Sequence, residues 1–344
     1  MPLTQIIQSK IKNEGPVSFH DFMEMALYYP TFGYYNSPQN KIGTNGDYYT
    51  SSVLSPVFGE MIGKQIEEMW FFLDKKPFTI IEYGAGTGAL CLDILRYLKN
   101  NPILYNGLEY CIIEKGEIMQ KLQKDLLSEK VHWYHSIREI DDINGCILSN
   151  ELIDNFPVHK IFMKEELMEV FVDYKNDFVE ILKPANEKLS NYLSDQNLIL
   201  PRDYCTEINL QALEWIKEIA ENLKTGFVIT IDYGFSSNVM YSEKRNSGTL
   251  ACYKEHNVNY CPYENIGQQD ITAHVNFSAL VLWGNKSGLD CCGFTSQANF
   301  LRSLGCMNYL RKLEIENKDN ANNDLIHQVN KLMVDMGSKF KVLI

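Results

Sequence analysis

The sequence lacks the features that would place the chain in a membrane or in an oxidising compartment. No apolar run approaches the ~20 residues that a membrane-spanning helix needs. The first residues, MPLTQIIQSKIKNEG, have neither the apolar core of a secretory signal nor the arginine- and serine-rich character of a transit peptide. The nine cysteines are scattered and form no CxxC pair, which is typical of reduced thiols. These absences predict a cytoplasmic protein, with a bacterial source as the simplest interpretation.

Positive charge is also scarce. The chain has 32 lysines and arginines against 44 aspartates and glutamates, a net charge of −12. Because phosphate binding depends on basic patches, this balance argues against nucleic acid as the main partner. A basic partner, such as a protein segment that carries arginine, fits better. We also expect no metal site, since the spacing of Cys252, His256, Cys261 and His274 matches no familiar zinc finger.

The first part of the chain, residues 1–75, is predicted to be a helical extension. Apolar residues recur there at helical spacing, and Ser18 is a candidate N-cap. Residues 28–52 are rich in tyrosine and turn residues, which indicates a long ordered loop. A further helix is expected from about Pro56 to Leu73. The rest of the chain, 76–344, then forms the core.

In the core, short apolar runs alternate with helical patterns. Strands are expected at 78–83, 109–114, 131–134, 146–149 and 227–232, with a closing strand at 340–344. This alternation predicts an α/β fold, a doubly wound parallel sheet with helices on both faces. Two segments interrupt the pattern and are predicted to be insertions. The first, about 160–205, contains a hairpin, and the second, about 235–285, is turn-rich and irregular.

A glycine-rich turn follows the first strand of the core. The chain there reads Glu82-Tyr83-Gly84-Ala85-Gly86-Thr87-Gly88 and then enters a helix. Glycines at such a turn permit positive φ angles and let a ligand approach the backbone closely. The helix N-terminus beyond them offers amide hydrogens to a carboxylate or a phosphate. The turn therefore predicts a cofactor site at Gly84, Gly86 and Gly88, and a tight turn without a ligand is the alternative.

Two cofactors suit this turn. Residues 84–89 also satisfy the dinucleotide fingerprint G-x-G-x-x-[GA], so an NAD-dependent dehydrogenase is one interpretation. Glu82 favours the other, because an acid two positions before the first glycine resembles the first motif of class I methyltransferases. In that motif, E/D-x-G-x-G-x-G, the acid helps to hold the amino-acid end of the cofactor. Glu114, which ends the second strand, suits an adenosine ribose under either interpretation.

Polar residues also follow the fourth strand, at Ser149-Asn150-Glu151-Leu152-Ile153-Asp154. Ligands of open α/β sheets bind beyond the carboxyl ends of the strands. We therefore predict that Asn150 contacts the cofactor and that Glu151 and Asp154 act in catalysis. The alternative for these two carboxylates is a helix N-cap.

Further candidates lie at the same edge of the sheet or in the tyrosine-rich loop. Asp232-Tyr233-Gly234 ends a later strand. Three polar residues of the loop are candidates to cover the cofactor pocket, with surface turn chemistry as the alternative: Asp47, Thr50 and Ser51. Three histidines are possible bases, although single histidines are more often structural: His159, His256 and His274.

The chain resembles the MidA family along almost its whole length. The segments that carry the resemblance are GPVSFHDFMEMALYYPTFGYY (15–35), GDYYTSSVLSPVFGE (46–60), IEYGAGTGAL (81–90), SNELIDNFPVHK (149–160), IDYG (231–234), GTLACYKEH (248–256), QDITAHVNF (269–277), GFTSQANFLRSLG (293–305) and MGSKFKVLI (336–344). Two of them, GDYYTS and NELIDNFPVHK, are specific to the family rather than generic to the fold.

The resemblance implies a class I methyltransferase with a Rossmann-like core that uses S-adenosyl-L-methionine. The mitochondrial members of the family are complex I assembly methyltransferases that modify an arginine symmetrically, so a protein substrate with an exposed arginine is implied here. The chain departs from the family in two places. The family commonly has Gly-Pro-Gly-Arg-Gly in the cofactor turn, and it often has Asp at the position of Asn276. Both departures leave the glycines in place, but the second makes the substrate less certain.

An arginine acceptor gives the two strand-end carboxylates a chemical role. A guanidinium is protonated at neutral pH and is a poor nucleophile, and carboxylates that grip it localise its charge. This is the hypothesis for Glu151 and Asp154. Two further alternatives remain at this point: a small-molecule methyltransferase, whose tyrosine-rich loop would stack on an aromatic acceptor, and a non-catalytic assembly factor that retains the fold.

Overall fold

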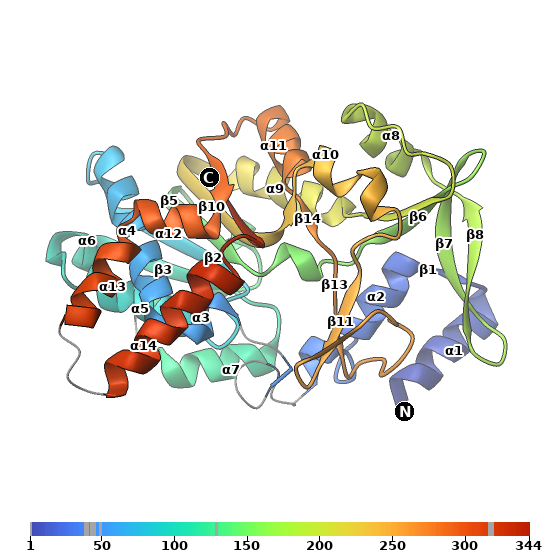
Figure 1. Cartoon of the computed structure of the whole chain (residues 1–344), viewed down its shortest axis with the longest axis horizontal. Coiled ribbons are helices and arrows are strands. Elements are labelled where there is room, and N and C mark those ends of the chain that lie inside the picture. Colours follow the sequence, from blue (N-terminus) through green and yellow to red (C-terminus); the bar gives the residue numbers. More distant parts are fainter. Residues whose placement is uncertain (1, 38–40, 42–45, 48–49, 128–129, 316–319) are drawn as a thin grey trace.

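The computed structural model describes residues 2–37, 41, 46–47, 50–127, 130–315 and 320–344. Figure 1 shows two groups of elements, one around a large sheet and one around two smaller sheets and the N-terminal helices. Within these ranges, no helix is long and apolar enough to cross a membrane. The division of the chain into an extension, 1–75, and a core, 76–344, stays a prediction.

The large sheet has the doubly wound α/β architecture that the sequence predicts. Its strands lie in the order β15-β16-β10-β5-β2-β3-β4, and β14 pairs with the end of β10. Their bounds in that order are Phe294–Ser296, Phe340–Leu343, Leu223–Phe235, Ile143–Asn150, Phe78–Tyr83, Leu108–Ile113 and Val131–Tyr134, with Val275–Asn276 for β14. The strands from β10 to β4 are parallel, and β16 is antiparallel to β10. The strand order reverses between β2 and β5, so the topological switch point of the sheet lies there.

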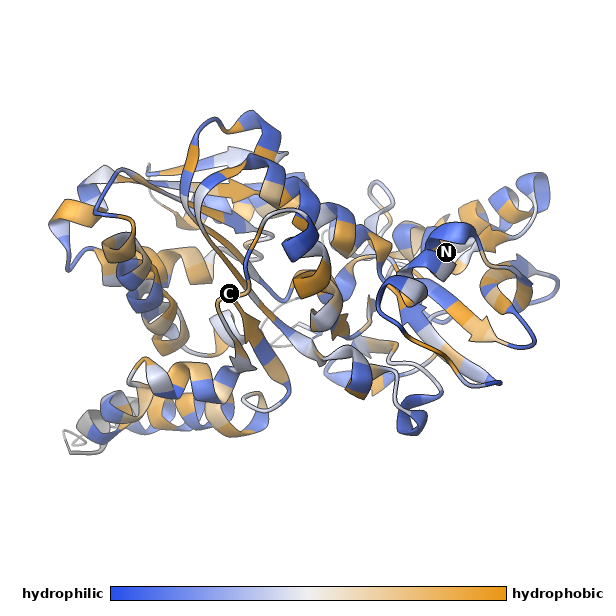
Figure 2. Cartoon of the chain, turned by 90° about the horizontal axis from the view of Figure 1, so that it is seen from above, coloured by the Kyte–Doolittle hydropathy of each residue, from blue (hydrophilic) through white to orange (hydrophobic). Residues whose placement is uncertain are grey.

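Successive residues of each strand pack on opposite faces of this sheet, as strand geometry requires. In β2, Ile80 contacts the core beneath α4 (Pro56–Phe72) and α5 (Ala89–Leu98). Its neighbour Ile81 contacts the core beneath α9 (Leu210–Asn222) and α11 (Phe277–Lys286). Both faces are therefore covered, which explains why these strands read as continuous apolar runs. Figure 2 shows that the surrounding helices carry hydrophobic residues on one side and hydrophilic residues on the other.

The remaining helices of this group complete the two layers. They are α6 (Pro102–Gly107), α7 (Glu117–Leu126), α12 (Gln297–Ser303), α13 (Cys306–Ile315) and α14 (Asn320–Asn330), with a 3₁₀ turn η2 (Ile137–Glu139) and a π-helical turn η5 (Lys331–Asp335). The strands expected at 78–83 and 131–134 have those bounds, and the helix expected from Pro56 ends at Phe72. The strand expected at 227–232 extends to Leu223–Phe235, because its ends continue the pairing with polar residues that an apolar pattern does not include.

The N-terminal segment is helical, as predicted. It contains α1 (Pro2–Glu14), α2 (Phe19–Tyr28), the 3₁₀ turn η1 (Tyr34–Asn36) and α3 (Ser51–Leu54). Ser18 is confirmed as the N-cap of α2, since its hydroxyl accepts a hydrogen bond from the Asp21 N–H at 3.0 Å. The tyrosine-rich loop over 28–52 contributes η1 and the start of α3. Parts of that loop, at 38–40, 42–45 and 48–49, lie outside the described residues.

The second sheet has five antiparallel strands, of which four follow β5 in the chain. It consists of β1 (Val17–Ser18), β6 (His159–Met163), β7 (Leu167–Tyr174), β8 (Phe178–Pro184) and β9 (Tyr204–Ile208), and α8 (Glu187–Asp195) precedes β9. The segment expected as the first insertion, 160–205, contains the expected hairpin as β6 and β7. The pairing of β1 with β7 attaches the N-terminal segment to this sheet. A two-residue strand gives no alternation, so the sequence could not predict that contact.

The segment expected to be irregular, 235–285, is more regular than the sequence predicts. It forms α10 (Ser237–Met240), the 3₁₀ turn η4 (Glu243–Arg245), most of α11 and a three-stranded sheet in the order β12-β11-β13. The bounds of these strands are Asn257–Asn259, Ala251–Lys254 and Asp270–Thr272. Strands of three or four residues are too short to show a period, which is why this expectation was wrong.

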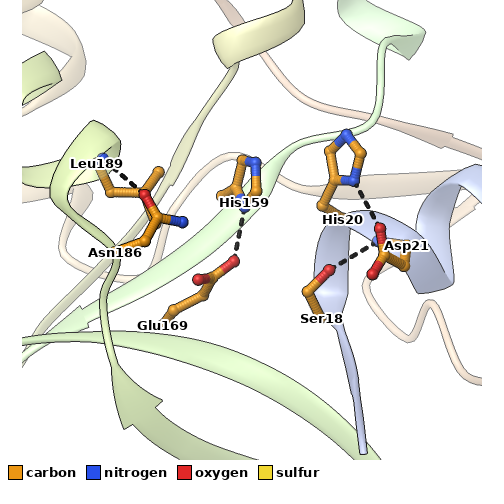
Figure 3. Close-up of polar contacts among 7 residues, drawn as sticks. All are labelled: Ser18, His20, Asp21, His159, Glu169, Asn186 and Leu189. Atoms are coloured by element: carbon orange, nitrogen blue, oxygen red, sulfur yellow. Dashed lines mark hydrogen bonds and ion pairs between the residues drawn. The ribbon is translucent and has the colours of Figure 1, made fainter. Parts of the chain in front are cut away.

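A pair of stacked histidines also joins the N-terminal segment to the second sheet (Figure 3). The rings of His20 and His159 lie 4.7 Å apart with an interplanar angle of 15°. The Nδ1 atom of His159 lies 2.6 Å from Glu169 Oε1, and that of His20 lies 3.1 Å from Asp21 Oδ1. His159 was a candidate base in the sequence. In the structure it is the first residue of β6, and its ring packs against His20 of α2.

Candidate active site

The glycine turn after β2 has the backbone geometry that the sequence predicts. Gly84, Gly86 and Gly88 have φ angles of +61°, +52° and +85°, which side-chain-bearing residues rarely adopt. Gly88 immediately precedes α5. A Cβ atom on Gly84 would lie 2.8 Å from Leu152 Cδ1, so the turn also packs closely against the segment that follows β5.

Glu82 lies beneath this turn. Its side chain is 2 % exposed, and its Oε2 accepts a hydrogen bond from the Tyr110 hydroxyl at 2.6 Å. Burial raises the pKa of Glu82 to about 7, and the hydrogen bond from Tyr110 opposes that shift. The predicted role of Glu82 at the amino-acid end of the cofactor stays a prediction.

The raised pKa of Glu82 makes stability depend on pH. The folded protein binds the proton of the Glu82 carboxyl more tightly than the unfolded chain does. The contribution of protonated Glu82 to the free energy of unfolding is therefore complete below pH 4.5 and is lost as the pH rises towards 7. Glu82→Gln cannot ionise. Its unfolding free energy relative to wild type is therefore expected to increase by about 2–3 kcal/mol between pH 5 and pH 8 without cofactor, from 1.36 kcal/mol per pKa unit. Urea denaturation of both proteins at several pH values measures this difference, and a difference that does not change with pH would contradict the assignment.

Glu114 is connected to the glycine turn through Gln123 of α7. Glu114 Oε1 accepts a hydrogen bond from the Gly116 N–H at 2.8 Å. The Gln123 amide donates to Glu114 Oε2 at 3.2 Å and to the Gly86 carbonyl at 2.9 Å. Gln123 is fully buried and accepts a hydrogen bond from the Trp133 indole. Sequence analysis missed Gln123; the available signal was a glutamine on the inner face of an otherwise amphipathic helix.

The carboxyl end of β5 meets the start of α3, although the two are about a hundred residues apart in the chain. Glu151 has a φ angle of +52°, and its Oε1 accepts hydrogen bonds from the Ser51 N–H at 2.8 Å and the Asn150 amide at 3.3 Å. Thr50 is the N-cap of α3, where its hydroxyl accepts a hydrogen bond from the Val53 N–H. The structure thus brings Thr50, Ser51, Asn150 and Glu151 together. Asn150 Oδ1 is buried and has no hydrogen-bond partner among the described residues.

Asp232, at the end of β10, holds the turn that contains Asp154. Asp232 is fully buried, and its Oδ2 accepts hydrogen bonds from the N–H groups of Leu152, Ile153 and Asp154 at 3.2, 2.9 and 3.3 Å. The alternative interpretation, a helix N-cap at Glu151 or Asp154, is not found in the structure. Instead Asp154 lies within a 3₁₀ turn, η3 (Ile153–Asn155), whose orphan amides are satisfied by Asp232.

The carboxyl groups around β5 are mutually destabilising. Burial raises the pKa of Glu151 to about 8, and the charge of Asp154 adds to this shift. Burial also raises the pKa of Asp154, and burial together with the charges of Asp154 and Glu151 raises that of Asp232. No lysine or arginine in the described part of the chain forms an ion pair with these three groups. A site of this kind favours a cationic ligand.

Asp47 occupies a different place from the other predicted cofactor residues. Its Oδ2 accepts a hydrogen bond from the Tyr34 hydroxyl at 2.7 Å, and its Oδ1 accepts one from the Glu255 N–H at 2.7 Å. The His256 N–H donates to the Asp47 carbonyl at 3.0 Å. These contacts attach the tyrosine-rich loop to the turn between β11 and β12. A direct contact of Asp47 with the cofactor stays a prediction.

Two other residues singled out in the sequence have structural contacts. Asn276 is the N-cap of α11, and its side chain also binds Ser237, Tyr192 and Gln196. The departure from the family at this position therefore lies in a buried polar network. His274 packs between Tyr233 and Phe235, and burial lowers its pKa to about 4, so its ring is neutral at pH 7.

The groups at the switch point fit a cofactor that has a nucleoside and an amino-acid end. The glycine turn leaves its backbone open to close approach, and Glu114 places a carboxylate directly after β3, where its contact with ribose hydroxyls stays a prediction. Asn150 Oδ1, at the end of β5, is a buried acceptor to which none of the described residues donates a hydrogen bond. This unsatisfied atom is the observation that most directly calls for a ligand donor.

Comparisons with known proteins agree with this fit. Residues 61–295 match the model of a family described as "Putative S-adenosyl-L-methionine-dependent methyltransferase". A crystal structure from Burkholderia thailandensis, of a protein described as a "likely methyl transferase" and bound to S-adenosyl-homocysteine, has a TM-score of 0.88 and 28 % identity. That similarity covers 99 % of this chain and 91 % of the other.

Two curated relatives are similar over nearly the whole chain. The mitochondrial protein arginine methyltransferase NDUFAF7 of Danio rerio is 26 % identical, over 97 % of this chain and 84 % of the relative. The homologue of that protein in Caenorhabditis elegans is 28 % identical, over 98 % of this chain and 85 % of the relative.

Proposed function

The chain belongs to this family of S-adenosyl-L-methionine-dependent methyltransferases, and on that premise we propose that it methylates an arginine side chain of a protein substrate. The cofactor is S-adenosyl-L-methionine rather than NAD, which resolves the ambiguity of the glycine pattern. Two curated relatives are named protein arginine methyltransferases, and this supports a protein acceptor.

The observation that carries the proposal is the uncompensated acidic site beyond β5. Glu151, Asp154 and Asp232 gather there, and the described residues provide no cation to pair with them. An arginine side chain is a planar cation whose five N–H donors match carboxylate oxygens. A neutral aromatic acceptor, as in a small-molecule methyltransferase, would leave these charges unpaired.

The residues of the site have distinct parts in the proposed reaction. Bound cofactor supplies a methyl group that is already activated on a sulfonium. The protein must therefore hold the acceptor nitrogen in line with that group and make it nucleophilic. Asp154 Oδ1, which is buried and has no hydrogen-bond partner in the described part of the chain, accepts a guanidinium N–H and draws positive charge away from the nitrogen that reacts. Asp232 keeps Asp154 in place through the backbone, and Glu151 ties the site to α3.

Glu151→Gln tests this proposal. We expect it to lower methyl transfer by about 10- to 100-fold, less than the loss of a preorganised charge that touches the acceptor, because Glu151 positions the site through Ser51. S-adenosyl-homocysteine should bind within twofold of wild type. The assay adds protein and S-adenosyl-L-methionine with a deuterated methyl group to a cell lysate, and mass spectrometry maps labelled arginines. Glu166→Gln, in the exposed turn between β6 and β7, is the matched control. Bound cofactor with no labelled arginine in the wild-type reaction would refute the proposal.

The type of partner and the cellular location of this protein remain proposals. An exposed arginine as the target, with no role for nucleic acid, rests on the net charge of −12 and on the acidic site. The cytoplasmic location expected from the sequence stays a prediction.

A further inference from the structure

The buried carboxylates near β5 are of two kinds. Asp232 and Glu151 already accept hydrogen bonds from backbone N–H groups, three at Asp232 Oδ2 and one at Glu151 Oε1. Those bonds fix the turn after β5 and the start of α3. These two oxygens are therefore used by the fold, whereas Asp154 and Asp270 each have an oxygen to which the described residues donate no hydrogen bond.

Asp154 is the first carboxylate that has an oxygen available to accept a hydrogen bond from a ligand. Its side chain is 6 % exposed, and its Oδ1 has no hydrogen-bond partner among the residues that the structure describes. Its negative charge raises the pKa of Glu151, of Asp232 and of Asp270. Because Coulomb interactions fall with distance, Asp154 lies at the centre of the acidic site.

Asp270, the first residue of β13, is the second carboxylate that has such an oxygen. The Ala273 N–H donates to the Asp154 carbonyl at 2.8 Å, so the residues after β13 lie against η3. Asp270 is 4 % exposed, and its Oδ1 accepts hydrogen bonds from the Tyr35 hydroxyl at 2.9 Å and from the Ile271 N–H at 3.0 Å. Both donors therefore go to the same oxygen. Burial, and then the charge of Asp154, raise the pKa of Asp270 to about 7.

Tyrosines from the N-terminal segment and from β11 surround this pair. The rings of Tyr28 and Tyr35 are stacked, with their centroids 5.4 Å apart, and the Tyr28 hydroxyl donates a hydrogen bond to Asn155 Oδ1 at 2.6 Å. Tyr253 is the register partner of Asp270 across β11 and β13, and burial, followed by the charges of Asp154 and Asp270, raises the pKa of Tyr253. In Figure 1, β11 and β13 lie between the large sheet and the N-terminal helices. The pair is thus enclosed by three segments that are far apart in the sequence.

This enclosure contains negative charge without a matching cation. Among the residues that the structure describes, no lysine or arginine forms an ion pair with Asp154 or Asp270. Two carboxylates that are buried close together without a cation are costly, and a cation that binds between them removes that cost. Aromatic rings beside such a site favour a delocalised cation further.

We propose that Asp270 and Asp154 together hold the guanidinium of the acceptor arginine, Asp154 from the turn after β5 and Asp270 from β13. The inference rests on the proposed function, because it assumes an arginine acceptor. In the reaction, the guanidinium nitrogen forms a bond to the methyl carbon, and the electron pair of the broken carbon–sulfur bond stays on sulfur. The proton that the nitrogen loses passes to one of the two carboxylates. Asp270 thereby fixes which nitrogen faces the methyl group.

The test measures binding of Nα-acetyl-L-arginine amide to the protein saturated with S-adenosyl-homocysteine, by saturation-transfer NMR. The uncharged isostere Nα-acetyl-L-citrulline amide is the control ligand. We expect wild type to bind the arginine probe at least tenfold more tightly than the citrulline probe. Asp270→Asn is expected to abolish that preference, with its affinity for S-adenosyl-homocysteine within twofold of wild type. Tyr35→Phe, which removes a donor but no charge, should retain most of the preference.

The outcomes separate this inference from the function on which it rests. If wild type prefers the arginine probe and Asp270→Asn keeps that preference, the role of Asp270 is wrong and the proposed function stands. If Asp270→Asn loses affinity for S-adenosyl-homocysteine to the same extent, Asp270 serves the cofactor site or the fold, and the inference is again overturned. If wild type does not distinguish the probes and labels no arginine in lysate, the proposed function itself fails.

Discussion

Replacement of Asp154 by asparagine is expected to lower the rate of methyl transfer by about 10²- to 10³-fold, the usual effect of removing one preorganised charge from a reaction centre. Asparagine has nearly the same shape, so packing around η3 should not change. The lost negative charge would leave the guanidinium delocalised and less nucleophilic. Affinity for S-adenosyl-homocysteine should stay within about threefold of wild type, because Asp154 lies beyond the strand end that carries Asn150.

Single-turnover methylation of a mapped substrate peptide, with calorimetry of cofactor binding, measures the two effects separately. Asp177→Asn is the matched control, since Asp177 lies in the exposed turn between β7 and β8. A parallel fall in turnover and cofactor affinity would instead assign Asp154 to the cofactor pocket. Asp154→Asn should also be at least as stable as wild type above pH 7, because it removes a buried carboxylate whose pKa is raised.

Much of the fold could be predicted because its signals are local. β2 is buried on both faces of the central sheet, so it appears in the sequence as a short apolar run with clear ends. The glycine turn needs positive φ angles at Gly84, Gly86 and Gly88, and that requirement is visible in the residue types. The switch-point rule then placed Asn150 and Asp154 near the turn without any structure.

The rest of the site depends on contacts between residues that are far apart in the chain. Asp270 meets Tyr35 across more than two hundred residues, and Glu151 meets Ser51 across a hundred. Nothing in the local pattern of a three-residue strand distinguishes Asp270 from a solvated turn residue. Gln123 was missed for a related reason, because a polar residue on a helix predicts exposure unless its partners are known.

The glycine turn after β2 packs against the turn after β5 at Gly84, where the nearest side chain is that of Leu152. One methyl group added at Gly84 should therefore weaken cofactor binding strongly. Gly84→Ala would force alanine to a φ of +61°, which costs about 1–2 kcal/mol, and would place its Cβ 2.8 Å from Leu152 Cδ1. The end of the Leu152 side chain can relieve part of this contact by a change of rotamer, so most of the expected effect comes from the strained backbone at Gly84. We expect affinity for S-adenosyl-homocysteine to fall by about 30- to 100-fold, equivalent to 2–3 kcal/mol at 1.4 kcal/mol per tenfold.

Two further variants separate backbone strain from the steric clash. Gly107→Ala, at the end of α6, has open space around the new Cβ and should bind S-adenosyl-homocysteine like wild type in calorimetry. Leu152→Ala in the Gly84→Ala background removes the clash but not the positive φ, so it should recover part of the lost affinity. Wild-type affinity in Gly84→Ala would mean that the turn tolerates a side chain and does not approach the cofactor. Partial recovery in the double variant would show that the glycine turn and the turn after β5 are packed as one unit, with Leu152 setting the distance between them.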